Sequence, residues 1–294
     1  MAKNENRRKA LKNIIAGTAA LSAGGMLSSF SRVEDKQSFL LKGNINHSVC
    51  RWCFNQFSVE ELSIAGKDMG LKAIDLVGPK DWPVLQKYGL ESSMCNGAEI
   101  NLIHGFNDKQ YHATLLKNYS DMIPLVAKAG YKNLICFSGN RAGKDDETGL
   151  SNSAEGLKQL MALAEKHKVT LVMELLNSKI DHKDYQCDKT PWGVELVKRV
   201  GSENFKLLYD IYHMQIDEGD VIRTIKDNHQ YIAHYHTAGV PGRHELDELQ
   251  ELNYPAIMKA IVATGFKGYV AQEFIPVKAD KLASLRQAVA LCDV

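Results

Sequence analysis

Four acidic or imidazole side chains stand at the ends of four successive apolar runs of this chain. The runs span residues 171–174, 206–210, 233–236 and 269–273, and they end in Glu174, Asp210, His236 and Glu273. Subtracting residue numbers gives spacings of 36, 26 and 37 positions, each about the length of one strand with its following helix. Three carboxylates and one imidazole are ligands that suit a divalent cation such as Mn, Mg, Co or Zn. The pattern therefore predicts a metal site.

A strand-end carboxylate has another ordinary role, because acidic groups favour the N-terminus of the following helix. Each of these residues could have that role singly. Three carboxylates meeting at the end of buried strands would repel one another and raise their own pKa values. A divalent cation removes that cost, so we interpret the four residues as one shared site.

The elements that must position these residues alternate eight times between strand-like and helical patterns. The expected strands span residues 47–54, 71–77, 90–95, 133–137, 170–174, 205–210, 231–237 and 268–274. Amphipathic segments with helical spacing include residues 115–129, 157–167, 194–200 and 257–264. Eight such units favour an α/β fold of the closed (β/α)8 TIM barrel type over residues 45–294, with the active site at the carboxyl ends of its strands. No Gly-x-Gly-x-x-Gly motif or P-loop follows a strand, which weakens dinucleotide and nucleotide alternatives.

Glycine marks four of the expected joints between a helix and the next strand. Gly70, Gly89, Gly130 and Gly265 are each followed by an apolar and then a charged residue. Glycine ends a helix because it adopts the left-handed conformation without steric penalty.

Long polar loops follow four of the expected strands, at residues 96–112, 139–153, 177–191 and 238–254. Barrels build their pockets from such loops. The polar residues that they carry are His104, His112, Arg141, His182, Arg243 and His244. We expect about two or three of these six to touch substrate.

The N-terminus has the pattern of a targeting segment. Asn6-Arg-Arg-Lys-Ala-Leu-Lys12 precedes an apolar stretch of small residues at 14–27, an arrangement that resembles the twin-arginine export signal. An amphipathic helix is the alternative, but the stretch lacks a polar face, and it is short for a membrane span. We therefore expect a signal segment at residues 1–30, a linker at 31–44, and an exported, periplasmic protein with no stable membrane span.

Charge and cysteine content exclude other classes. Residues 1–30 hold five basic residues against one acidic residue, a net charge of +4, so the remaining residues carry −3 of the total of +1. This mildly acidic body argues against a nucleic-acid partner. Six cysteines in 294 residues do not form a disulfide framework. Cys50 and Cys53 have redox or zinc spacing, but neighbouring positions on a strand alternate between faces and no second such pair follows.

From about residue 45 onward the chain resembles the hydroxypyruvate isomerase branch of the xylose isomerase-like barrels, which also includes ketose 3-epimerases. The likeness is strongest in YDIYHMQ at 209–215, HYHTAGVPGR at 234–243 and GYVAQEF at 268–274. It implies that Glu174, Asp210, His236 and Glu273 hold one divalent metal ion, with Glu174 and Glu273 as the catalytic acid/base pair. His213 and Arg243 fall where similar proteins bind substrate oxygens.

We add His182 and His104 to the expected substrate-binding residues. The isomerases often have Gln at the third ligand position, whereas this chain has His236, as the epimerases do.

The chemistry expected of such a site is proton transfer. A cation that chelates a carbonyl and an adjacent hydroxyl stabilises an enediolate, while one glutamate removes a proton and another returns it, each step contributing about 10²- to 10⁴-fold. The chain has no Asp-x-Asp after the seventh strand and no His three residues after Glu174 to hold a second metal. The sequence thus predicts an aldose-ketose type isomerase, hydroxypyruvate isomerase-like, acting on a small unphosphorylated sugar or hydroxy-keto acid; a homo-oligomer is compatible with this prediction.

Three alternatives stay open. The first is a ketose 3-epimerase or related sugar epimerase, the second a non-catalytic sugar-binding barrel, and the third a metal-dependent endonuclease. The intact glutamate pair argues against the second. The net negative charge of residues 31–294 and the presence of only four expected metal ligands argue against an endonuclease.

Overall fold

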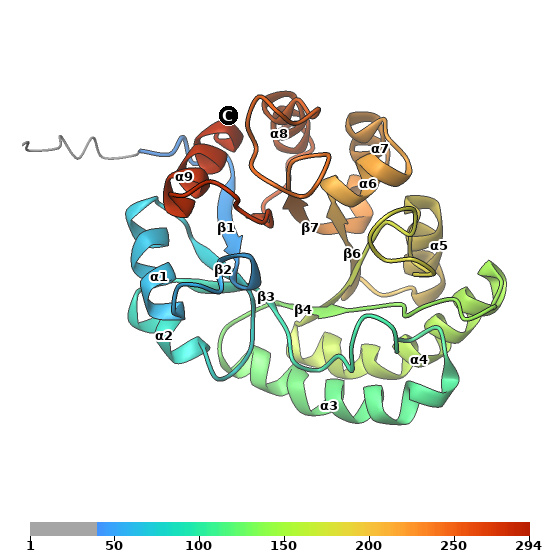
Figure 1. Cartoon of the computed structure of the whole chain (residues 1–294). Coiled ribbons are helices and arrows are strands. Elements are labelled where there is room, and N and C mark those ends of the chain that lie inside the picture. Colours follow the sequence, from blue (N-terminus) through green and yellow to red (C-terminus); the bar gives the residue numbers. More distant parts are fainter. Residues whose placement is uncertain (1–39) are drawn as a thin grey trace, which may run out of the picture. The chain divides into compact units, whose positions relative to one another are not determined.

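The structure is a computed structural model that describes residues 40–294. The expected signal segment and most of the expected linker lie outside these described residues. Eight parallel strands close into a barrel in the order β1 to β8, each hydrogen-bonded to the next and β8 to β1. Helices pack around the strands (Figure 1). The predicted (β/α)8 barrel is confirmed.

The strands form where the sequence places them. They are β1 Asn46–Cys50, β2 Ala73–Val77, β3 Glu91–Cys95, β4 Asn133–Cys136, β5 Thr170–Glu174, β6 Phe205–Asp210, β7 Ile232–Thr237 and β8 Tyr269–Gln272. The bounds of β5 and β6 are those expected. β1 is shorter, because the 3-10 helix η1 (Arg51–Phe54) follows Cys50 directly. Cys50 and Cys53 therefore do not share a strand, and the face-alternation argument applied to them is wrong.

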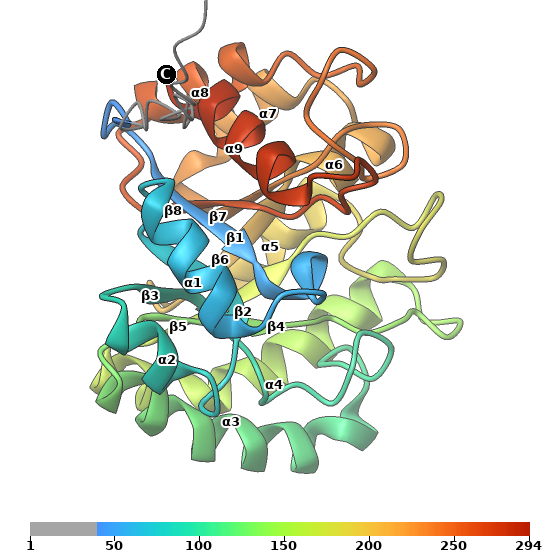
Figure 2. The same cartoon turned by 60° about the vertical axis from the view of Figure 1, so that its left-hand side comes forward.

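Nine α-helices occupy the described part of the chain. They are α1 Val59–Asp68, α2 Trp82–Lys87, α3 His112–Lys128, α4 Asp146–His167, α5 Thr190–Val200, α6 Ile211–Asp217, α7 Val221–Asn228, α8 Tyr254–Ala263 and α9 Lys281–Cys292. The long loops that follow the strands gather at one end of the barrel, on the right in Figure 2.

Helix α4 begins earlier than its sequence pattern indicates. Residues 146–153 were expected in a loop but form its first two turns. The Asp145 side chain accepts a hydrogen bond from the Thr148 backbone N–H at 2.7 Å and so caps the helix. A Cβ atom at Gly149 would lie 2.4 Å from Gln186, and one at Gly156 would lie 2.9 Å from His112. These two glycines thus permit close packing of the helix rather than ending it.

The four glycines expected to end helices have positive φ angles: 79° at Gly70, 66° at Gly89, 85° at Gly130 and 80° at Gly265. The left-handed conformation was the reason for predicting helix ends there. The repeated joint is confirmed.

Polar side chains lie inside the barrel among otherwise apolar strands. Ser48, Asp75, Ser93, His234 and His236 are all buried. The pairing of β2 with β3 shifts register on both sides of Asp75, and such bulges turn a side chain to a new direction.

None of the helices in the described range is long and apolar enough to cross a membrane.

Candidate metal and catalytic centre

The structure brings the four predicted ligands together at the carboxyl ends of four adjacent strands. Glu174 ends β5, Asp210 ends β6, His236 lies in β7 and Glu273 directly follows β8. One ligand atom from each lies within 4.8 Å of the others, and all four side chains are buried. Two ligands of one cation at 2.0–2.6 Å can be no more than about 5 Å apart. The donor types and their spacing therefore fit a single divalent cation.

His236 is the centre of this cluster. Its Nδ1 atom lies 2.5 Å from Glu273 Oε2, 3.2 Å from Glu174 Oε1 and 3.9 Å from Asp210 Oδ2. Burial alone would lower the pKa of His236, but the adjacent Glu273 carboxylate and further contacts raise that pKa well above its ordinary value. Without a cation, a protonated His236 therefore partly neutralises the carboxylates.

Arg243 supplies the remaining positive charge. Its Nη2 atom donates to Asp210 Oδ2 at 2.7 Å and also to Glu273 Oε2. Its backbone has a φ of +59°, a conformation that non-glycine residues seldom adopt and that is concentrated at functional sites. Asp210 has a structural role as well, because its Oδ1 accepts the His213 backbone N–H at 3.1 Å and caps α6. Asp210 thus caps the helix that follows β6 and also belongs to the four-residue cluster.

The two glutamates have pKa values displaced in opposite directions. Burial, followed by the charge of Glu273, raises the pKa of Glu174 to about 7. Burial also acts to raise the pKa of Glu273, but His236 and Arg243 outweigh it and lower that pKa to about 2. Paired carboxyls whose environments separate their pKa values in this way are suited to act as an acid and a base.

The expected substrate-binding residues divide into two groups. His213 lies beside the cluster, with Nε2 3.0 Å from Arg243 Nη1, and the His182 ring packs edge-on against it at 5.2 Å. Burial lowers the pKa of both histidines. His104 instead contacts Asn101 and stacks on Tyr111, and none of its contacts reaches the cluster.

The other loop residues have structural partners. His112 Nε2 contacts Phe106 O at 2.9 Å, Arg141 pairs with Asp188 at 3.1 Å, and His244 Nδ1 contacts Ile275 O at 3.0 Å. Of the six expected candidates, Arg243 and His182 therefore lie nearest to the centre.

Three residues next to the cluster were missed in the sequence. Asp75 Oδ1 lies 3.0 Å from His236 Nε2. In the sequence, Asp75 could have been noticed as the one carboxylate in the apolar run 73–77. The Trp52 Nε1–H donates to Glu273 Oε1 at 2.7 Å, for which the sequence offers no signal. Cys50 Sγ lies 3.4 Å from Asp75 Oδ1 and 3.8 Å from His236 Nε2, and burial, then Glu273, raises its pKa well above the usual range.

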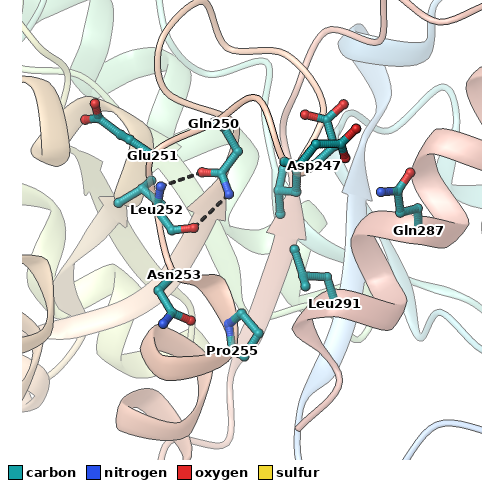
Figure 3. A pocket seen from close by; sticks show the side chains of 10 residues that line it. Asp247, Gln250, Glu251, Leu252, Asn253, Pro255, Gln287 and Leu291 are labelled. Carbon is teal, nitrogen blue, oxygen red and sulfur yellow. Dashed lines mark hydrogen bonds between the residues drawn. The ribbon is translucent and has the colours of Figure 1, made fainter. Parts of the chain in front are cut away.

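A pocket of about 460 Å³ lies elsewhere, between the loop after β7 and α9 (Figure 3). Gln250 shapes its wall by pairing with both backbone groups of Leu252 at 2.7 Å. None of the predicted site residues lines it, so it is separate from the chemistry described above.

Comparisons with known proteins agree with the barrel fold. A family model described as xylose isomerase-like TIM barrel matches residues 83–291. The chain is 38% identical over 108 residues to a 2-oxo-tetronate isomerase of Cupriavidus necator, covering 37% of this chain and 41% of that protein. It is 30% identical over 148 residues to hydroxypyruvate isomerase of Escherichia coli, covering 50% and 57%. The matches thus span about half the length of these curated relatives.

Solved structures share the barrel. An AP endonuclease of family 2 from Brucella melitensis has a TM-score of 0.73 and 22% identity, covering 82% of this chain and 97% of that one. A D-psicose 3-epimerase with D-tagatose from Clostridium cellulolyticum has a TM-score of 0.70 and 16% identity, covering 85% and 97%. A zinc-bound IOLI protein has a TM-score of 0.65 and 17% identity, covering 84% and 95%. These likenesses are to the fold.

Proposed function

This chain belongs to the xylose isomerase-like TIM barrel family, and we propose that it is a metal-dependent isomerase that transfers a proton between neighbouring carbons of a hydroxy-keto compound, as a hydroxypyruvate isomerase does. The observation that carries this proposal is the arrangement of Glu174 and Glu273, whose carboxylates lie 3.2 and 2.5 Å from the same His236 nitrogen. The curated relatives named 2-oxo-tetronate isomerase and hydroxypyruvate isomerase support it.

Glu273 is the base and Glu174 the acid in this proposal. In the site without a cation, the pKa of Glu273 is lowered to about 2 and that of Glu174 is raised to about 7, and this difference supports the assignment of base and acid. Glu273 removes a proton from the hydroxyl-bearing carbon beside the substrate carbonyl, and Glu174 gives a proton to the carbonyl carbon. The hydroxyl proton passes to the former carbonyl oxygen, so the carbonyl and the hydroxyl exchange places and the number of protons on the substrate is unchanged. Proton exchange with solvent then returns Glu273 to its ionised form and Glu174 to its protonated form.

Glu174, Asp210, His236 and Glu273 would hold the divalent cation. When bound, the cation acts as a Lewis acid toward the negative charge that develops on the substrate oxygens. The zinc of the IOLI protein supports a metal on this fold. Arg243 and His213 line the same centre, where their N–H groups can donate to substrate oxygens and orient the carbon that loses its proton.

Proton exchange tests this function directly. NMR in D₂O with hydroxypyruvate should show deuterium entering the substrate in the presence of Mn²⁺ or Zn²⁺ and none after chelation. Glu273→Gln and Glu174→Gln should each reduce exchange by at least about 10²-fold. The control Glu248→Gln, at an exposed position of the loop after β7, should keep the wild-type rate. Exchange at the wild-type rate in Glu273→Gln would show that the two-glutamate mechanism is wrong, and binding without exchange would indicate a sugar-binding barrel.

A ketose 3-epimerase is the second candidate, favoured by the histidine at the third ligand position and by the fold of the psicose epimerase. The same spectra separate the two reactions. An isomerase places solvent deuterium on the neighbouring carbon, the former carbonyl carbon, whereas an epimerase places it on the carbon that lost its proton, with inverted configuration.

We also propose that residues 1–30 direct export to the periplasm by the twin-arginine route. The support is the Arg7-Arg8 pair before an apolar stretch. That route carries folded proteins, which suits a barrel that binds its metal before export.

A further inference from the structure

The Asn177 side chain, in the loop after β5, is fully buried beside His213 of α6. Its Oδ1 atom accepts the backbone N–H groups of Ile180 and Asp181 at 3.0 and 2.9 Å. Its Nδ2 atom donates to Asp181 Oδ2 at 2.7 Å and lies 2.6 Å from His213 Nδ1. An asparagine amide can accept two hydrogen bonds and donate two, so these contacts use every hydrogen-bonding position of the Asn177 amide.

The same contacts fix which end of the amide faces His213. Turning the amide by 180° would place its NH2 group against two backbone N–H donors and its oxygen against the Asp181 carboxylate. Both contacts would be repulsive, and burial makes an unsatisfied polar group costly. The atom of Asn177 that faces His213 Nδ1 is therefore the N–H donor.

Both nitrogens of the His213 ring thus face an N–H donor. Nδ1 faces Asn177, and Nε2 lies 3.0 Å from Arg243 Nη1. A doubly protonated ring would place a hydrogen against a donor at both contacts, whereas a neutral imidazole has one acceptor nitrogen and one N–H. The ring is therefore neutral, and only one of its two nitrogens accepts a hydrogen bond.

Nδ1 is the nitrogen that accepts. The Asn177 amide cannot turn away from it, and Asp181 Oδ2 lies 3.9 Å from Nδ1, which is too far for this oxygen to accept a hydrogen bond from an N–H at Nδ1. Nε2 instead faces the Asp210 carboxylate, with Oδ2 at 3.7 Å, and the negative charge there favours a hydrogen on that side of the ring. The hydrogen of the His213 ring accordingly lies on Nε2.

We propose that Asn177 is a positioning residue that holds His213 as the Nε2–H tautomer. The Nε2–H group and an N–H of Arg243 Nη1 then lie side by side, so one substrate oxygen can accept hydrogen bonds from both. Fixed donors of this kind stabilise an oxygen on which negative charge develops during the reaction. The inference rests on the proposed function, because enediolate formation is the step that places such charge on a substrate oxygen.

Nitrogen NMR reads the tautomer directly, because protonated and unprotonated ring nitrogens differ widely in chemical shift. The full chain is labelled with ¹⁵N-histidine and loaded with Zn²⁺, and the spectrum of His213→Gln identifies the His213 signals. In the wild type the hydrogen should be on Nε2. This measurement needs no variant of Asn177, and a hydrogen on Nδ1 would by itself overturn the proposal.

Exchanging the side chains of Asn177 and Asp181 should change the tautomer without changing the net charge. In the double variant Asn177→Asp, Asp181→Asn, the carboxylate at position 177 can still accept the two backbone N–H groups, but it offers His213 Nδ1 an acceptor. The ring hydrogen should move to Nδ1. The kcat for isomerisation of hydroxypyruvate should then fall about 10²-fold, as for removal of one oxyanion donor, with KM changed less than threefold because the lost contact strengthens in the transition state.

The matched control is Asp181→Asn alone, which keeps the Asn177 donor and should retain the Nε2–H tautomer, with kcat within threefold of the wild type. An unchanged tautomer in the double variant, or an equal fall of kcat in the control, would overturn the role of Asn177. The ring signals of His104, which contacts Asn101 and Tyr111 instead, report whether each variant is folded.

A second variant covers failure of the double variant to fold. Asn177→Ser keeps an oxygen in the loop and removes the N–H that faces Nδ1, so both tautomers of His213 should become populated. A single Nε2–H tautomer in this variant would overturn the proposal. If the wild type isomerises no compound, the isomerase proposal fails, and the spectra alone still decide whether Asn177 fixes the His213 ring.

Discussion

Asp75 Oδ1 lies 3.0 Å from His236 Nε2, on the side of the ring opposite the three carboxylates. Asp75 is fully buried, lies 2.9 Å from His234 Nε2, and accepts the Ser93 hydroxyl at 2.5 Å. Burial acts to raise its pKa, but His234 and His236 outweigh burial and hold that pKa far below its ordinary value. An ionised Asp75 keeps the imidazole N–H at Nε2 and so leaves Nδ1 able to bind a cation.

Replacing Asp75 should therefore weaken metal binding without touching a ligand. We expect Asp75→Asn to reduce Mn²⁺ or Zn²⁺ affinity by about 10- to 100-fold, as is common for such partners of a ligand histidine. Ser93→Ala is the control, because it removes one hydrogen bond to Asp75 and keeps the carboxylate; its loss should be smaller. Isothermal titration measures both, and an unchanged affinity in Asp75→Asn would rule out the orienting role.

Metal affinity should rise with pH. The Glu273 carboxylate overcomes burial and raises the pKa of His236 well above its ordinary value, so at neutral pH the ring carries a proton that a cation must displace. One displaced proton gives up to about tenfold tighter binding per pH unit below that pKa. Titrations in buffers of different ionisation enthalpy count the released protons. Affinity that is constant between pH 6 and 8, with no proton release, would contradict the prediction.

Trp52 should set the acid limb of the pH profile. Its indole N–H donates to Glu273 Oε1 at 2.7 Å, and a hydrogen bond to the ionised form lowers a carboxyl pKa. Trp52→Phe removes this donor, so the pKa of Glu273 rises. Glu273 then becomes protonated, and activity is lost, at a higher pH than in the wild type. Because the Trp52 side chain is 44% exposed, we expect a shift of about half to one unit in kcat/KM profiles.

Trp192→Phe is the matched control for Trp52→Phe. Its indole donates to the Asp146 carbonyl at 3.3 Å, away from the glutamates, so the acid limb should not move. If the acid limb of the kcat/KM profile does not move in Trp52→Phe, or moves to lower pH, the indole does not lower the pKa of Glu273.

Export should depend on the arginine pair. Changing Arg7 and Arg8 to Lys keeps the positive charge but removes the arginine pair of the proposed export signal. The protein should then remain in the cytoplasm, and it should be folded and active in the exchange assay. Lys3→Arg, outside the pair, is the control and should export normally. Cell fractionation measures both, and continued export of the double variant would show that the twin-arginine interpretation is wrong.

The sequence by itself determined the barrel and the four residues at its rim. Strand length, apolar patterning and helix-ending glycines such as Gly130 are local properties, and parallel strands that alternate with helices place all their carboxyl ends together. The ends of β5 and β6 at Glu174 and Asp210 follow from that rule without knowledge of any distant contact.

Only the tertiary structure decided what surrounds those four residues. Asp75 is 161 positions from His236, and Trp52 is 221 positions from Glu273. Trp52 meets Glu273 because the barrel closes β1 against β8, whereas Asp75 of β2 meets His236 of β7 across the interior of the barrel. The early start of α4 likewise depends on how separate loops and helices pack. Side-chain directions in such loops are set by contacts between segments far apart in the chain, and no local pattern encodes them.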